Sequence, residues 1–197
     1  MAQSSSKRGP GDGSGRDALI RATISVVAAK GLRGLTFRAV AEAAGVNNSL
    51  IAHYFGSRDA LIEAAFDQAV HESIDISHLD EFPDSREGFI DSLGAMLAAN
   101  SDREIFVYEM VLAARRRPEI AERVSRLYDD YVTTLAASLR RALGGAFSED
   151  RARYAFAALD GLVLQRLAGV PRETIQRTLG VLWDDVMSYA GNDDRAL

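Results

Sequence analysis

Residues 35–66 read LTFRAVAEAAGVNNSLIAHYFGSRDALIEAAF. Apolar side chains recur here at every third or fourth position, which is typical of amphipathic helices. Thr36 can cap a short helix over Phe37–Ala44, and the glycine that follows can end it. Asn47 can cap a second short helix over Asn48–Phe55. Two short helices with this spacing predict a helix-turn-helix, a motif that presents its second helix to the major groove of DNA.

The same helical periodicity continues on both sides of this motif, with no convincing two-residue alternation. We therefore predict an all-α fold of about nine helices. Gly31 suits a left-handed cap at the end of the first helix. The predicted helices outside the motif cover about residues 19–30, 57–76, 85–100, 101–117, 118–143, 149–168 and 171–189. Ser57 and Ser85 are the predicted caps of the fourth and fifth helices.

Charge divides unevenly along the chain. The first 58 residues hold eight basic and three acidic side chains, a formal net charge of +5. The remainder holds 15 basic and 25 acidic side chains, a formal net charge of −10. A basic front half favours contact with a polyanion such as DNA, although chance asymmetry stays an alternative.

Several classes of protein are excluded by composition. The chain has no cysteine, which excludes disulfides, thiolate metal sites and cysteine nucleophiles. The longest stretch without a charged residue, Ala43–Ser57, is shorter than the roughly 20 apolar residues of a membrane span. The first residues lack the apolar run of a secretory signal, so a cytoplasmic location is expected. His71 and His78 are a weak candidate for a metal site, and we predict no cofactor and no enzymatic activity.

The motif resembles the N-terminal domain of the TetR family of transcriptional repressors, over about Arg16–Phe66. The matching features are Thr36 opening the second helix, the turn Ala44–Val46, the closing run His53–Phe55 and the turn Gly56–Leu61 into the next helix. The resemblance implies a homodimeric, sequence-specific DNA-binding regulator, a repressor that binds a palindromic operator and is switched by a small molecule.

The resemblance also implies a domain organisation. Residues 1–15 would be a flexible basic tail, residues 16–60 the DNA-binding domain, and residues 61–197 a domain for ligand binding and dimerisation. The stretch Glu109–Leu143 is weakly similar to the ligand domain of betaine-regulator-type members. A regulator controlled by a protein partner, or by no effector, stays open, as does an all-helical enzyme or adaptor.

Residues for DNA contact follow from the family positions and from chemistry. Arginine can pair with guanine and asparagine with adenine, while hydroxyls and helix N-termini hold phosphates. Many family members carry a tyrosine where this chain has Ala52, which leaves the operator sequence open. The expected DNA-binding residues are Thr36, Arg38, Asn47, Asn48, Ser49, Ala52, His53, Tyr54 and Arg58.

Two further sets of residues are implied for the acidic part of the chain. Glu109 and Asp160 lie within apolar sequence and could meet a cationic ligand group or an internal arginine such as Arg166. The expected ligand-binding residues are Met96, Phe106, Glu109, Met110, Tyr128, Tyr131, Phe156, Asp160 and Gln165, although each could instead be core.

The last two helices are apolar on more than one side, which favours a four-helix dimer interface. The alternative is that both helices fill the core of a single chain. The expected interface residues are Tyr154, Leu162, Ile175, Leu179, Leu182 and Val186.

Overall fold

The computed structural model describes residues 12–77, 79–99, 101–143 and 147–190. Within these ranges the chain forms nine α-helices and no strand, which confirms the predicted all-α fold. In chain order the helices are α1 (Asp12–Gly34), α2 (Phe37–Ala44), α3 (Ser49–Phe55), α4 (Arg58–Ser77), α5 (Arg86–Ala99), α6 (Ser101–Ala114), α7 (Pro118–Leu143), α8 (Glu149–Leu167) and α9 (Arg172–Ala190). None of them is long and apolar enough to cross a membrane.

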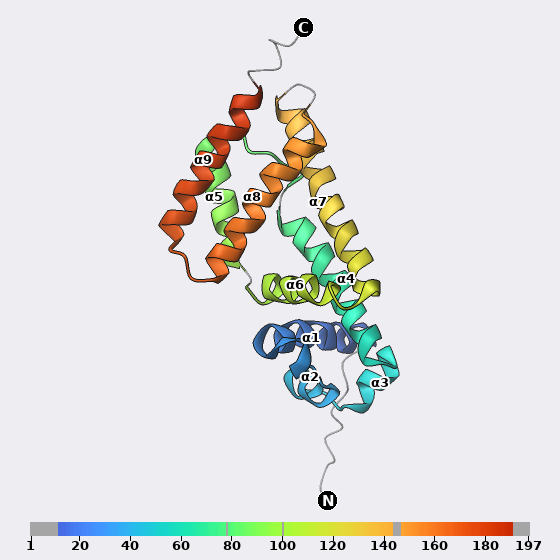
Figure 1. The fold of residues 1–197 in the computed structure, drawn as a ribbon. Helices are drawn as coiled ribbons and strands as arrows, with labels where there is room; N and C mark the ends of the chain where they lie inside the picture. Colours follow the sequence, from blue (N-terminus) through green and yellow to red (C-terminus); the bar gives the residue numbers. More distant parts are fainter. Residues whose placement is uncertain (1–11, 78, 100, 144–146, 191–197) are drawn as a thin grey trace, which may run out of the picture.

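The nine helices form two connected bodies (Figure 1). Helices α1, α2 and α3 make the lower body near the N-terminus. Helix α4 begins there and runs upward into a larger bundle that contains α5 and α7–α9. Helix α6 lies directly above α1 in this view and packs along it, so α4 and α6 both join the two bodies.

The predicted helix starts are confirmed by their side-chain hydrogen bonds. The hydroxyls of Thr36, Ser57 and Ser85 each accept a hydrogen bond, at 3.1 Å, from the backbone amide three residues further on. Asn47 accepts a hydrogen bond from the backbone amide of Ser49 at 3.0 Å, but the cap position of α3 is held by Asn48, whose side chain makes no capping hydrogen bond, so the predicted cap was one residue too early. That helix begins at Ser49, one residue later than predicted.

Two predictions concern the ends of α1. Gly31 takes a positive φ of 66° and leaves helical geometry, so the first helical run ends at this residue, as its predicted cap role requires. A short second run follows the kink and continues α1 to Gly34, beyond the predicted end. Most of the predicted tail over residues 1–15 lies outside the described residues, and residues 12–15 belong to the first turn of α1 instead.

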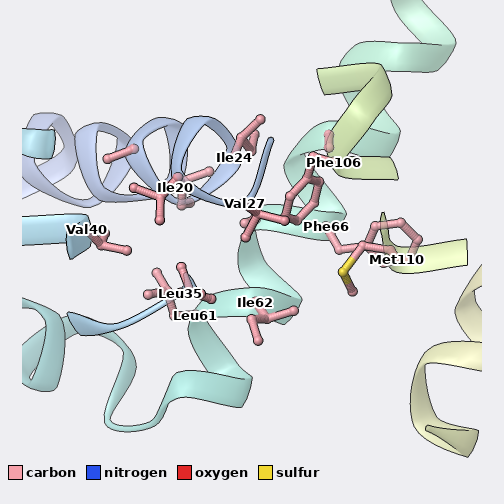
Figure 2. Close-up of a cluster of buried hydrophobic side chains, with 14 of the residues drawn as sticks. Ile20, Ile24, Val27, Leu35, Val40, Leu61, Ile62, Phe66, Phe106 and Met110 are labelled. Carbon is pink, nitrogen blue, oxygen red and sulfur yellow. The ribbon is translucent and has the colours of Figure 1, made fainter. Parts of the chain in front are cut away.

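A first hydrophobic core joins the lower body to α6 (Figure 2). Val27 of α1, Leu61 and Phe66 of α4, and Phe106 and Met110 of α6 are all buried in it. Phe106 and Met110 were predicted to line a ligand site, and that prediction is wrong because both side chains are enclosed by this core. The apolar face of α6 thus fixes the helix to the lower body through burial.

A second core fills the upper bundle, where Phe82 stacks on Trp183 with ring centroids 5.1 Å apart. The predicted interface residues Leu162, Ile175, Leu179, Leu182 and Val186 are buried in this core of the single chain. For these five residues the prediction of a dimer contact is therefore wrong, and the alternative of an intrachain core holds. Only Tyr154 of the predicted set is exposed.

Candidate functional site

Helix α3 presents a polar face to solvent. Ile51 is fully buried against the first core, and this fixes the rotation of the helix. The residues on the opposite side are exposed: Asn48, Ser49, Ala52 and His53. These are four of the predicted DNA-contact residues, and their spacing of three and four places them on one side of the helix. An exposed polar helix of this kind is what a major groove admits.

Tyr54 differs from its neighbours on α3. It is half-buried, packs against the first core and meets the ring of His53 edge-on at 5.2 Å. An alanine in place of Gly15 would bring its Cβ within 3.3 Å of the Tyr54 hydroxyl. Tyr54 thus supports the N-terminal part of α1, and its contact with DNA stays a prediction.

Helix α2 adds a cation beside this surface. Thr36 and Arg38 are exposed, and the hydroxyl of Thr36 already caps the helix. Arg38 makes no hydrogen bond or ion pair with any residue in the described part of the chain, so its guanidinium is available to a phosphate or a guanine edge.

Arg58 is engaged within the protein. Its Nε donates a hydrogen bond to the backbone carbonyl of Leu35 at 3.0 Å, and its Nη2 donates to that of Leu32. The half-buried side chain therefore ties the start of α4 to the connection between α1 and α2. This positioning role was not foreseen from the sequence, and the predicted phosphate contact of Arg58 stays a prediction.

A partly open cavity lies in the larger bundle. Its walls come from α4 and the loop after it, and from α5, α6, α7 and α8. Its volume of about 100 Å³ suits a small molecule, since an engineered cavity of about 150 Å³ binds benzene. Five of the predicted ligand-binding residues line it: Met96, Tyr128, Tyr131, Phe156 and Asp160.

The other predicted ligand-binding residues lie elsewhere. Phe106 and Met110 belong to the first core. Glu109 is not among the residues that line the cavity, and its carboxylate accepts a hydrogen bond from the backbone amide of Leu32 at 3.4 Å. Gln165 is exposed on α8, and so is Arg166. The suggested pairing of an acidic group with Arg166 is therefore wrong.

Asp160 is the acidic centre of the cavity. Its carboxylate accepts hydrogen bonds from the hydroxyls of Tyr108 at 2.6 Å and Tyr128 at 3.3 Å. Burial raises the pKa of Tyr108 well above its usual value, and the hydrogen bond and charge of Asp160 raise it further. Burial and then the charge of Asp160 raise the pKa of Tyr128 to about 12. Both hydroxyls therefore stay protonated donors at neutral pH.

An aromatic pair forms another wall. Tyr131 stacks on Phe156 with ring centroids 4.9 Å apart and an angle of 22° between the planes. Burial raises the pKa of Tyr131. A hydrogen bond with Ser73 and the positive charge of Arg103 oppose that shift, whereas the negative charge of Asp160 supports it.

Sequence reasoning missed ten of the fifteen residues that line the cavity, and two of the ten are polar and central to its chemistry, Tyr108 and Arg103. Arg103 is only 3% exposed, and its Nη2 donates to Glu104 at 2.5 Å. A usable signal was present, because Arg103 precedes Phe106 and Met110 by three and seven residues and so shares their buried side of α6. The weak metal candidate gains no support: His78 lies outside the described residues, and within them no three potential ligands gather.

Two family models match this chain. One describes "Bacterial regulatory proteins, tetR family" and matches residues 19–65. The other describes a "Tetracyclin repressor-like, C-terminal domain" and matches residues 84–185. The chain belongs to the TetR family. It is therefore a DNA-binding transcriptional regulator of the helix-turn-helix type, as the motif predicts, and the regulators of this family are not enzymes.

Individual relatives agree with this assignment. The chain is 30% identical over 161 residues to the HTH-type transcriptional regulator BetI of Stenotrophomonas maltophilia (strain R551-3), covering 76% of this chain and 80% of that protein. A TetR-family regulator from Rhodococcus sp. has the same fold, with a TM-score of 0.72, 22% identity and coverage of 89% and 99% of the two chains. A regulator from Saccharomonospora viridis, solved in complex with choline, matches with a TM-score of 0.72, 19% identity and coverage of 88% and 97%.

Proposed function

We propose that this TetR-family regulator is a cytoplasmic homodimeric repressor whose operator binding is controlled by a small organic cation in the cavity. The observation that carries the proposal is the carboxylate of Asp160 on an otherwise largely aromatic and apolar cavity wall. The charged groups that line the cavity are Arg103, Glu104 and Asp160, so the walls carry a formal net charge of −1. A monocation would neutralise that charge.

Aromatic surfaces add to the attraction for a cation. The face of an aromatic ring attracts an ammonium group, more strongly where water is excluded. Tyr128, Tyr131 and Phe156 supply such rings beside Asp160. The choline held by the Saccharomonospora viridis regulator is a ligand of this chemical class.

Helix α6 is the element through which such a ligand would act on DNA binding. Its residues Arg103 and Tyr108 line the cavity, whereas Phe106 and Met110 lie in the core shared with α1 and α4. The carboxylate of Glu109 also holds the amide of Leu32, directly after the kink in α1. In the proposed dimer each subunit contributes one α3 helix, and the spacing of the two must match major grooves about 34–36 Å apart. A ligand that favours one position of α6 would thereby favour one spacing of these helices.

The dimer surface that we propose lies on the exposed sides of α8 and α9. Tyr154 and Leu164 of α8 and Val181 and Met187 of α9 are large apolar or aromatic side chains that remain exposed in the single chain. Exposed apolar groups gathered on a helix pair are typical of four-helix contacts between identical subunits. This set replaces the five predicted interface residues that the second core buries.

A charge on this surface should separate the subunits. We expect both Leu164→Glu and Val181→Glu to shift the protein from dimer to monomer at micromolar concentration, because each places an unpaired carboxylate in an apolar contact. Analytical ultracentrifugation measures the change. Leu112→Glu is the matched control, because Leu112 is 67% exposed but lies on α6. Unchanged dimers in both test variants would place the interface elsewhere.

The effector proposal is tested with Asp160→Asn, which preserves the shape of the side chain and removes its charge. We expect choline, used as the probe, to bind about tenfold or more weakly to the variant by calorimetry, because a charged acceptor is lost. Asp130→Asn, an exposed change on α7, is the control and should bind choline as the wild-type protein does. Equal binding by all three proteins, or no binding by the wild-type protein, would contradict the cationic effector.

A further inference from the structure

The buried side chain of Arg103 has an unused hydrogen-bond donor. The residue is 3% exposed, and its Nη2 is taken by the carboxylate of Glu104. Its Nε has no hydrogen-bond partner in the part of the chain that the structure describes. A buried N–H group of a charged side chain is costly to leave unpaired and is nearly always satisfied in folded proteins. A missing partner therefore points to a group that the protein alone does not supply.

Arg103 and Asp160 face the same cavity from two helices, α6 and α8. The stacked pair of Tyr131 and Phe156 lines the same space. The charges of both Arg103 and Asp160 act on the hydroxyl of Tyr131, so both charged groups lie near the same stretch of the cavity wall. A single small molecule can therefore meet Asp160 at one end and Arg103 at the other.

The charge of Glu104 decides which kind of ligand group can accept a hydrogen bond from Arg103. Glu104 already balances the positive charge of Arg103, through an ion pair of 2.5 Å. A ligand carboxylate at Nε would lie beside the carboxylate of Glu104 and would be repelled by it. An uncharged oxygen accepts the same hydrogen bond without that repulsion, and it leaves the net charge of the site to be neutralised by the cationic end.

We propose that Arg103 is a specificity-determining residue, which selects effectors that carry an uncharged oxygen acceptor in addition to the cationic group. The acceptor is a hydroxyl, ether or carbonyl oxygen, and it accepts a hydrogen bond from Nε of Arg103. This inference rests on the proposed cationic effector, and it adds the second anchoring point of the ligand.

A matched series of three cations tests the inference by calorimetry on the full-length protein. Choline carries a hydroxyl, n-propyltrimethylammonium replaces that hydroxyl with a methyl group, and glycine betaine carries a carboxylate. We expect choline to bind the wild-type protein about tenfold or more tightly than the propyl compound, because it alone of this pair completes the hydrogen bond to a charged donor. Glycine betaine should bind less tightly than choline.

Arg103→Lys assigns the preference to this residue. Lysine keeps the positive charge beside Glu104 but lacks the Nε–H of the planar guanidinium. The variant should lose the preference for choline over the propyl compound, to within about threefold, while its affinity for the propyl compound stays close to that of the wild-type protein. This pattern differs from that of a structural defect, which would weaken the binding of all three compounds together.

The outcomes separate the two proposals. Two outcomes overturn the role of Arg103: the wild-type protein binds choline and the propyl compound equally tightly, or Arg103→Lys still prefers choline. Neither outcome contradicts the cationic effector. Tightest binding of glycine betaine overturns the uncharged acceptor. Failure of all three compounds to bind overturns both proposals. The wild-type comparison needs no variant, so the test holds even where Arg103→Lys does not fold.

Discussion

Arg38→Glu should abolish specific DNA binding while leaving the fold intact. We expect affinity for a DNA fragment that contains the operator to fall about a hundredfold or more, because the change replaces a cation with an anion beside α3 in both subunits of the dimer. Arg38 is exposed on α2, so its replacement disturbs no core. Fluorescence anisotropy measures the effect, with the DNA next to the protein's own coding sequence as the first fragment to test.

Arg126→Glu is the matched control for this prediction. It makes the same change of charge at an exposed position on α7, where the only described partner of Arg126 is Glu122 one helical turn away. Exposed pairs of this kind contribute little to stability. We expect the control to bind DNA as the wild-type protein does. A salt dependence of binding that stays the same in Arg38→Glu would show that Arg38 contacts no phosphate.

The helix-turn-helix could be predicted from sequence because its geometry is set locally. Thr36, Asn47 and Ser57 satisfy free backbone amides within three residues of themselves, so each helix start depends only on its own neighbourhood. Gly45 ends α2 with a φ of 65°, a conformation that glycine adopts without a steric penalty. The face that α3 exposes follows from the same periodicity, once Ile51 is assigned to the core.

The cavity could be predicted only in part, because periodicity shows which side of a helix is buried but not against which neighbour. Tyr131 and Phe156 were expected at a shared ligand site and do line one cavity, whereas Phe106 was assigned to the same site on the same grounds and does not line it. The buried side of α6 has two different surroundings. Phe106 packs in the core with residues of α1 and α4, whereas Arg103 lines the cavity. Which residues of α6 face the core and which face the cavity depends on how the neighbouring helices are arranged. That arrangement is a property of the whole fold and cannot be read from the periodicity of one helix.

The prediction of the dimer-interface residues failed for a related reason. The most regular apolar residues of α9, such as Leu179 and Ile175, are used by the core of the single chain. The residues that remain exposed, such as Val181, lie outside the buried stripe of three- and four-residue spacing, so periodicity does not assign them to a contact. A strongly apolar stripe marks the most deeply buried side of a helix, and the dimer surface that we propose uses the apolar residues that remain exposed.

Phe106→Ala should be the most destabilising of the substitutions considered. Phe106 is 0% exposed, and it packs in the core that joins α6 to α1 and α4 (Figure 2). Truncating a buried phenylalanine removes its burial and leaves a cavity, which costs about 3–5 kcal/mol of the free energy of unfolding. Urea denaturation measures the loss, at one fixed protein concentration because dissociation of a dimer contributes to the stability.

Leu112→Ala on the same helix is the control, and its 67% exposure predicts a loss below about 0.5 kcal/mol. The comparison also separates a core role of Phe106 from a ligand-binding one. A residue that lined the ligand cavity would change choline affinity when truncated, with only a modest loss of stability. We expect the reverse, a large loss of stability with nearly unchanged choline affinity in the molecules that remain folded. Phe106 fixes α6 to the lower body, which carries the helix-turn-helix. Its truncation should therefore also weaken the effect of choline on DNA binding, although choline itself still binds.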